Sequence, residues 1–275
     1  MATETTEQPI DIELPKSLRA TRLGAIAHLR LARAEKRNAL DDGTVLGLET
    51  FFTRLPGDIR AVVLTGEGAH FSAGLDLFDR LSEVTEHHDP LEGVLHSRMW
   101  HRAFDAIQFG RTPVIAALHG AVVGGGLELA AATHIRVAER STYYGLPEGQ
   151  RGIFLGGGGS VRIARLIGVA RIQDMMLTGR TLSAEEGHSA GATQYLVDDG
   201  KGFETAMALA AKAASNTATT NFAVLHALPR IFDSDPASGL LTESLMAAIA
   251  EMSGEAKERL KDFLEKRAAK VTRQS

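Results

Sequence analysis

The chain has 275 residues, of which 44% are hydrophobic, and its formal net charge is -4 at pH 7. A chain of this size can bury a large core, so we expect one large domain, with or without an appendage. The mildly negative charge argues against a nucleic-acid-binding surface. No apolar run approaches the roughly 20 residues that span a bilayer, and cysteine is absent. We therefore expect a soluble protein of the reducing cytoplasm, without disulfides or thiolate chemistry.

The N-terminal part of the chain predicts a tail followed by strands and one helix. Residues 1–17 are acidic and polar, without the hydrophobic core of a secretory leader, so we expect a flexible tail. Residues 18–31 alternate loosely between apolar and polar side chains, which favours one or two strands, and residues 33–38 form a polar loop. Apolar residues recur at helical spacing from Asp41 to Leu55, so this segment is predicted to be a helix.

Strand, turn and helix signals alternate along most of the remaining chain. Residues 79–93 are charged and poorly periodic and predict a mobile loop. We expect strands at 61–65, 114–118, 134–138, 142–145 and 195–197, and helices at 95–109, 160–167, 170–177 and 184–190. From Phe203 onward the pattern is helical only. The expected organisation is thus a tail of residues 1–17, a core of residues 18–200 and a helical region of residues 201–275.

The most informative stretch is the apolar run Val114–Leu118 with the glycine-rich segment that follows it. His119-Gly120 and then Gly124-Gly125-Gly126 precede strong helix formers that begin at Leu127, so the stretch predicts a strand, a tight turn and a helix. Glycine lets a ligand approach the main chain, and the first amides of a helix have no internal partners. Such a turn can hold a negatively charged oxygen, and Glu128 lies in the first helical turn beside it.

Other kinds of glycine-rich or catalytic site fit the sequence poorly. A dinucleotide-binding fingerprint would need glycine at Leu129, and no Gly-Lys-Ser/Thr follows a glycine cluster, as a P-loop requires. There is no H-E-x-x-H and no cysteine, so no metal site is expected, and no G-x-S-x-G elbow marks a serine nucleophile. The residues alone leave open whether the turn is merely close-packed and whether Glu128 and Glu148 are surface acids.

Four motifs occur along the chain. They are Phe71-Ser72-Ala73-Gly74-Leu75-Asp76, His119-Gly120 with Gly124-Gly125-Gly126-Leu127-Glu128, Pro147-Glu148 with Gly152 and Gly156–Gly159, and Phe263-Leu264-Glu265-Lys266-Arg267. Together they resemble the crotonase family, close to enoyl-CoA hydratase, from about Leu18 to the C-terminus. The resemblance implies an α/β fold, a crotonase-like spiral of ββα units with a helical C-terminal trimerisation region. It also implies acyl-CoA substrates, no cofactor apart from the coenzyme A of the substrate, and a homotrimer or dimer of trimers.

The resemblance also implies roles for four residues. It places an oxyanion hole on the backbone amides of Leu75 and Gly125, which agrees with the chemistry, because reaction next to a thioester develops negative charge on the carbonyl oxygen. Glu128 and Glu148 would hold one water molecule between them. We expect Glu148 to be the principal proton donor to C2 and Glu128 to activate the water, with the two carboxyl groups titrating as a coupled pair.

Ala73, Asp76, Phe78 and Gly124 are expected to bind the substrate. Leu75, Phe78, Leu81 and Val84 could line the acyl pocket as a short helix, with Phe78 as the largest side chain. Coenzyme A is expected at Lys36 or Arg37 of the same subunit, and at Phe263 and Lys266 of a neighbouring subunit. The segment after Glu148 departs from the common hydratase pattern, because Gly149-Gln150-Arg151 replaces aliphatic residues and Leu155 replaces a usual proline. This leaves open a bulky or hydroxylated acyl group, while we expect Arg151 to form a structural ion pair.

Three other functions compete with hydration. Isomerases of this family usually keep an acid only at the Glu148 position, and hydroxycinnamoyl-CoA hydratase-lyases usually lack the one at Glu128. A non-catalytic scaffold that binds acyl-CoA would need neither acid nor the oxyanion glycines. The presence of both acids and of the glycines therefore favours an enoyl-CoA hydratase, a hydro-lyase that adds water across the 2,3 double bond of a 2-enoyl-CoA.

Overall fold

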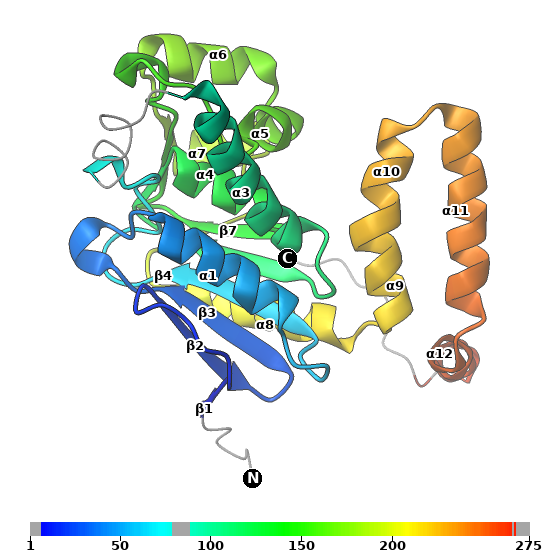
Figure 1. The fold of residues 1–275 in the computed structure, drawn as a ribbon. Helices are drawn as coiled ribbons and strands as arrows, with labels where there is room; N and C mark the ends of the chain where they lie inside the picture. The colour runs from blue at the N-terminus through cyan, green and yellow to red at the C-terminus, as the bar shows by residue number, and fades with distance from the viewer. Residues whose placement is uncertain (1–6, 79–88, 266, 268–275) are drawn as a thin grey trace. The chain divides into compact units, whose positions relative to one another are not determined.

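The computed structural model describes residues 7–78, 89–265 and 267. Contacts divide the chain into two compact units, residues 1–214 and residues 215–275, and Figure 1 labels many of their helices and strands. None of the helices in the described ranges is long and apolar enough to cross a membrane.

A mostly parallel sheet forms the centre of the first unit. Its strand order is β1-β2-β3-β4-β5-β7-β10; the first three strands pair antiparallel, and the pairs from β3 to β10 are parallel. The strands are β1 (Gln8–Pro9), β2 (Leu18–Leu23), β3 (Ile26–Leu31), β4 (Ala61–Gly66), β5 (Val114–Leu118), β7 (Ile135–Glu139) and β10 (Tyr195–Val197). A second sheet has the order β6-β8-β9, with β6 (Ala121–Val123), β8 (Tyr143–Gly145) and β9 (Leu182–Ser183). Parallel neighbours need crossover connections, which here carry helices that cover the sheet.

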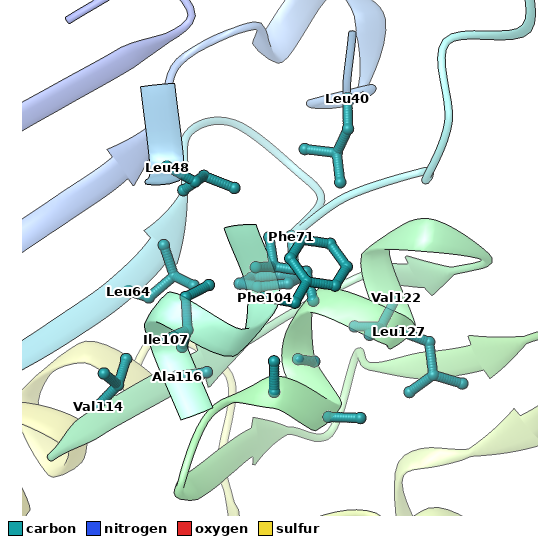
Figure 2. Close-up of a cluster of buried hydrophobic side chains, with 14 of the residues drawn as sticks. Leu40, Leu48, Leu64, Phe71, Phe104, Ile107, Val114, Ala116, Val122 and Leu127 are labelled. Carbon is teal, nitrogen blue, oxygen red and sulfur yellow. The ribbon is translucent and has the colours of Figure 1, made fainter. Parts of the chain in front are cut away.

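Both faces of the central sheet are buried. Along β4, Leu64 faces the larger hydrophobic cluster and Val63 the smaller one, because successive side chains of a strand point to opposite faces. Helices α1 (Asp42–Thr53) and α3 (Pro90–Gln108) pack against each other and add apolar side chains to the larger cluster. Figure 2 shows Leu64 and Phe104 within it.

The boundary between the two units differs from the one expected from the sequence. Helix α8 (Gly202–Ser215) buries Ala206 and Ala210 in the smaller cluster, against the central sheet. Contacts therefore divide the chain after Ala214 and not after Gly200.

The segment before the first predicted strand is packed against the first unit. β1 pairs with β2, and Ile10 is buried in the larger cluster. Pro15 lies so close to α1 that a Cβ atom on Gly47 would be 2.6 Å from its Cδ atom. The expected flexible tail is thus wrong for residues 7–17, because a polar composition does not prevent a few apolar side chains from docking. Residues 1–6 of that tail lie outside the described ranges.

Most of the predicted elements of the first unit are present. The strand region 18–31 is two strands that turn at Gly24, whose φ of +59° favours glycine. The other helices of this unit are α4 (Gly125–Ala132), α5 (Gly159–Ile167), α6 (Val169–Thr178) and α7 (Ala184–Ala190), with the 3-10 turns η1 (Ala34–Lys36) and η2 (Gly149–Arg151). The sequence did not predict β6 and β9, which have only three and two residues.

Helix α3 begins at Pro90, earlier than the predicted start at Leu95. The side chain of Asp89 accepts a hydrogen bond from Leu91 N at 2.9 Å, and proline is well suited to the first helical turn. Residues 90–93, predicted as the end of a mobile loop, thus belong to α3. Residues 79–88 of that predicted loop lie outside the described ranges.

The described part of the second unit is helical, as predicted. Its elements are α9 (Ala218–Phe222), the π-helical turn η3 (Ala223–Ala227), α10 (Leu228–Asp233), α11 (Pro236–Glu251) and α12 (Gly254–Leu264). The side chains of Thr217, Asp235 and Ser253 cap α9, α11 and α12 by accepting hydrogen bonds from backbone amides.

Candidate active site

Two turns approach each other at the start of α4. In the turn formed by residues 71–76, Gly74 adopts a φ of +87°. A Cβ atom on Gly74 would lie 2.5 Å from Val123 O and 2.9 Å from Gly125 N, so only glycine fits there. A Cβ atom on Gly125 would in turn lie 3.3 Å from Leu75 N. This close approach places the Leu75 and Gly125 backbones side by side.

The backbone amides of Leu75 and Gly125 donate no hydrogen bond to another described residue. Gly125 is the first residue of α4, where amides have no intrahelical acceptor. Gly124 precedes it with a φ of +53° and donates its own amide to Gly145 O at 2.9 Å, which fixes the turn. Leu75 and Gly125 both line the same cavity, so the two amides are available to an anionic oxygen there.

Glu128 is a buried carboxyl group at this cavity. It lies in the first turn of α4, and its Oε1 atom accepts hydrogen bonds from Gly157 N at 2.9 Å and from Gly159 N at 2.8 Å. Burial raises the pKa of Glu128 to about 7; the two glycine amides oppose the shift and the Glu148 carboxylate adds to it. Near neutral pH the group can therefore exist in both protonation states.

Glu148 is also buried but is held differently. It follows β8 and directly precedes η2, and its Oε2 atom has no hydrogen-bond partner in the described part of the chain. Its Oε1 atom lies at the glycine turn, since a Cβ atom on Gly124 would be 2.7 Å from it. Burial raises the pKa of Glu148, and the positive charge of Arg151 partly offsets this. A carboxyl group with an unbonded oxygen and a raised pKa is suited to proton transfer.

The cavity that these groups share has a volume of about 280 Å³. Its lining includes the apolar side chains of Leu75, Leu77, Trp100, Ile153 and Phe154, the acids Glu128 and Glu148, and the polar side chains of His96, Ser97 and Arg151. Ala73 and Gly124, both predicted to bind the substrate, also belong to the lining. An apolar wall around two carboxyl groups limits their contact with bulk water and strengthens the interactions between charges inside.

Phe78, predicted as the largest side chain of the acyl pocket, does not line this cavity. It is 82% exposed, and Leu77 lines the cavity in its place. Both residues lie in a helical turn, where successive side chains are rotated by about 100°. A turn that directs Leu77 to the cavity therefore directs Phe78 away from it, which contradicts the prediction made for Phe78.

Asp76 also lies outside the lining of the cavity. Its Oδ2 atom accepts hydrogen bonds from Arg33 Nη2 at 2.9 Å and from Lys36 Nζ at 3.0 Å. Burial acts to raise the pKa of Asp76, but the hydrogen bonds and charges of Lys36 and Arg33 outweigh it and keep the pKa below its ordinary value. Asp76 thus forms internal ion pairs, and the charge of Lys36, expected at coenzyme A, is partly neutralised by one of them.

The remaining residues predicted to bind coenzyme A are dispersed over the chain. Arg37 is exposed, has a φ of +53°, and its carbonyl accepts a hydrogen bond from Ala73 N at 2.9 Å. Phe263 is exposed on α12 in the second unit. Lys266 lies outside the described residues.

The sequence analysis gave Arg162 no role and expected Arg151 to form an ion pair; the structure differs for both. Arg162 of α5 is buried and donates to Gly157 O at 3.0 Å, behind the turn that binds Glu128. Arg151 lines the cavity and forms no ion pair with a described residue, so the expected structural ion pair is not found. Within the described ranges, no group of three or more acidic or histidine side chains is arranged to bind a metal ion.

Comparison with known proteins identifies the class. The profile of the family described as Enoyl-CoA hydratase/isomerase matches residues 21–274, so the chain belongs to this family, the crotonases, and has their α/β fold, as predicted. A Bacillus subtilis protein named "Probable enoyl-CoA hydratase" is 34% identical over 212 residues, which cover 76% of this chain and 80% of that protein.

Two solved structures extend the similarity. The "putative enoyl-CoA hydratase" of Rhodopseudomonas palustris CGA009 is 54% identical, with a TM-score of 0.88 over 94% of this chain and 98% of that one. The enoyl-CoA hydratase of Bacillus anthracis is 30% identical, with a TM-score of 0.83 over 91% of this chain and 97% of that one.

Proposed function

We propose that this protein is an enoyl-CoA hydratase, which adds water across the 2,3 double bond of a 2-enoyl-CoA thioester. The observation that carries the proposal is that two buried carboxyl groups, Glu128 and Glu148, line one cavity together with two backbone amides that donate no hydrogen bond to a described residue. Membership of the hydratase/isomerase family and the names of the similar proteins support the same reaction.

The thioester carbonyl is bound by the amides of Leu75 and Gly125. As water adds at C3, negative charge develops on the carbonyl oxygen, and the two amides stabilise this charge more than they stabilise the neutral substrate. Removing one donor of this kind typically costs about a hundredfold to a thousandfold in rate.

The two carboxyl groups transfer the protons of the reaction. Glu128, as a carboxylate, takes a proton from the water molecule whose oxygen bonds to C3, and Glu148, as an acid, gives a proton to C2. Burial raises the pKa of both groups, to about 7 for Glu128, so that proton exchange with each is accessible nearer to neutral pH than for an ordinary carboxyl group. After the product leaves, one proton passes from Glu128 to Glu148 and restores the pair, which titrates as a coupled unit.

The coenzyme A part of the substrate is bound by basic residues at the surface. Arg37 makes the contact from the same subunit, because Lys36 already pairs with Asp76. Phe263 and Lys266 make it from a neighbouring subunit of a homotrimer or a dimer of trimers. No cofactor is needed beyond the coenzyme A of the substrate, and the protein acts in the cytoplasm.

The test is a panel of short, long, branched and aromatic 2-enoyl-CoAs, with mass spectrometry of the products. An added water molecule on at least one of them is expected. Turnover of a 3-enoyl-CoA without a gain in mass would replace the proposal with an isomerase, and release of a shorter acyl-CoA would replace it with a hydratase-lyase. Binding of acyl-CoAs without any turnover would leave a non-catalytic scaffold.

A further inference from the structure

A buried arginine lies on the far side of the turn that binds Glu128. Arg162 of α5 is 8% exposed, and all three of its guanidinium nitrogens donate hydrogen bonds. Nε donates to Gln108 Oε1 at 2.7 Å and Nη2 to Asp105 Oδ1 at 2.5 Å, both on α3. Nη1 donates to Gly157 O at 3.0 Å. The guanidinium thus ties the glycine turn to α3.

Gly157 connects this arginine to the catalytic carboxyl group. Its carbonyl accepts from Arg162, while its amide donates to Glu128 Oε1 at 2.9 Å. The turn has little free space, because a Cβ atom on Gly157 would lie 3.0 Å from Glu128 Oε2, and one on Gly158 would lie 2.3 Å from Arg162 Nη1. Since a close-packed turn transmits displacement, a shift of Arg162 must move the amides that bind Glu128.

We propose that Arg162 is a positioning residue, which fixes the turn Gly156–Gly159 against α3 and thereby orients the carboxyl group of Glu128 for reaction. Arg162 is not part of the lining of the cavity, so it acts through the turn and not on the substrate. The inference deepens the proposed hydratase function and rests on it for the role of Glu128, but the hydrogen-bonded chain from Arg162 to Glu128 does not depend on the reaction.

The charge of Arg162 and the hydrogen bonds from the turn that it holds both favour the carboxylate form of Glu128. Glu148 adds to the rise of the Glu128 pKa that burial causes, and Arg162 opposes that rise. Asp105 strengthens the charged form of Arg162 and Arg165 weakens it, and His101, whose pKa burial lowers, feels the charges of Arg162 and Asp105. Because a cation favours the carboxylate, loss of Arg162 should raise the pKa of Glu128 further and leave less of the base form at neutral pH.

Two substitutions separate the charge from the geometry. Arg162→Gln removes the charge and at least two of the three donors, whereas Arg162→Lys keeps the charge but cannot reproduce the planar fork that reaches three acceptors. Arg171→Gln is the matched control, because Arg171 of α6 donates to Ile167 O at 2.8 Å and does not line the cavity.

The experiment combines kinetics with carboxyl 13C NMR, in which the Glu128 signal is assigned by its absence from Glu128→Gln. For Arg162→Gln we expect a Glu128 pKa above the wild-type value and a fall in kcat of about a hundredfold at pH 7, with KM changed less than kcat. For Arg162→Lys we expect a Glu128 pKa close to wild type but a reduced kcat. Arg171→Gln should change neither quantity.

A folded Arg162→Gln with a wild-type Glu128 titration and a wild-type pH profile would overturn the proposal, as would a fully active Arg162→Lys if Arg162→Gln does not fold. The NMR titration needs no turnover. If the protein hydrates no enoyl-CoA, the proposed function fails, while an altered Glu128 titration would still support the link between Arg162 and Glu128.

Discussion

Of the two acids that line the cavity, Glu128 accepts hydrogen bonds from two glycine amides, whereas Glu148 leaves one oxygen without a partner among the described residues. Both carboxyl groups are buried and both pKa values are raised. The two groups therefore differ mainly in how many hydrogen bonds hold them in place, and not in how far they are buried. A restrained carboxylate is suited to orient and deprotonate a water molecule, and a carboxyl group with a free oxygen is suited to deliver a proton.

The strongest test of this comparison removes each acid in turn. Glu128→Gln and Glu148→Gln should each lower the hydration rate by at least about a hundredfold, because each removes proton transfer while keeping the size of the side chain. Steady-state kinetics on the best substrate of the panel measures this. Near wild-type turnover in either variant would show that the two-acid mechanism is wrong. If only Glu128→Gln remains active on a 3-enoyl-CoA, the isomerase alternative is favoured.

A second prediction concerns stability and depends on Glu128 alone. The pKa of Glu128 is about 7 in the folded protein against an ordinary value of 4.5. A carboxyl group whose pKa is raised by folding contributes stability below its unfolded pKa and loses it as the pH rises through its folded pKa. Between about pH 4.5 and pH 8 the wild type should therefore lose on the order of 2 to 3 kcal/mol that Glu128→Gln keeps.

Urea unfolding of both proteins at these two pH values and one protein concentration measures the difference. An equal pH dependence for wild type and Glu128→Gln would mean that the Glu128 pKa is not raised.

A third prediction changes the turn that binds Glu128 without substituting either acid. In Gly157→Ala the new Cβ atom would lie 3.0 Å from Glu128 Oε2 and 3.0 Å from Phe104 Cε2, so the carboxyl group must move. We expect kcat to fall by about tenfold and stability by about 1 to 3 kcal/mol from overpacking. Gly254→Ala is the control, because nothing lies within 4 Å of its Cβ position. Unchanged kcat in Gly157→Ala would show that the turn does not control Glu128.

The sequence selected Leu75, Gly125, Glu128 and Glu148, and the structure brings these four residues to one cavity. Their chemical roles stay a prediction. The strand, glycine turn and helix around Gly125 are readable because each signal lies within a few neighbouring residues. The α/β crotonase fold followed from motifs whose order and separation are specific.

The parts that could not be predicted depend on contacts between distant segments. The amides of Gly157 and Gly159 reach Glu128 from another helix start, and no local pattern in the sequence pairs them. The choice between Leu77 and Phe78 depends on the rotation of a helix about its axis, which apolar neighbours at consecutive positions leave undetermined. Likewise, the docking of Ile10 depends on the core it meets, not on its own polar surroundings.

The last and smallest expected effect is on the Glu148 side. The positive charge of Arg151 lowers the pKa of Glu148 against the effect of burial, so Arg151→Ala should raise that pKa. If Glu148 donates its proton, the acid form then persists to higher pH, and the alkaline limb of the kcat profile should move upward by about half a pH unit or less. Arg151 is exposed, so the shift should shrink at high salt.

Arg151→Lys is the matched control for this prediction, because it keeps the charge and should keep the wild-type profile at low salt. An upward shift of the acidic limb in Arg151→Ala, with the alkaline limb unmoved, would assign the proton-accepting role to Glu148 instead, since a base with a raised pKa loses its proton only at higher pH. No shift at low salt would mean that Arg151 is too well solvated to act on Glu148. A shift seen equally in Arg151→Lys would mean that the shape of the side chain, and not its charge, sets the environment of Glu148.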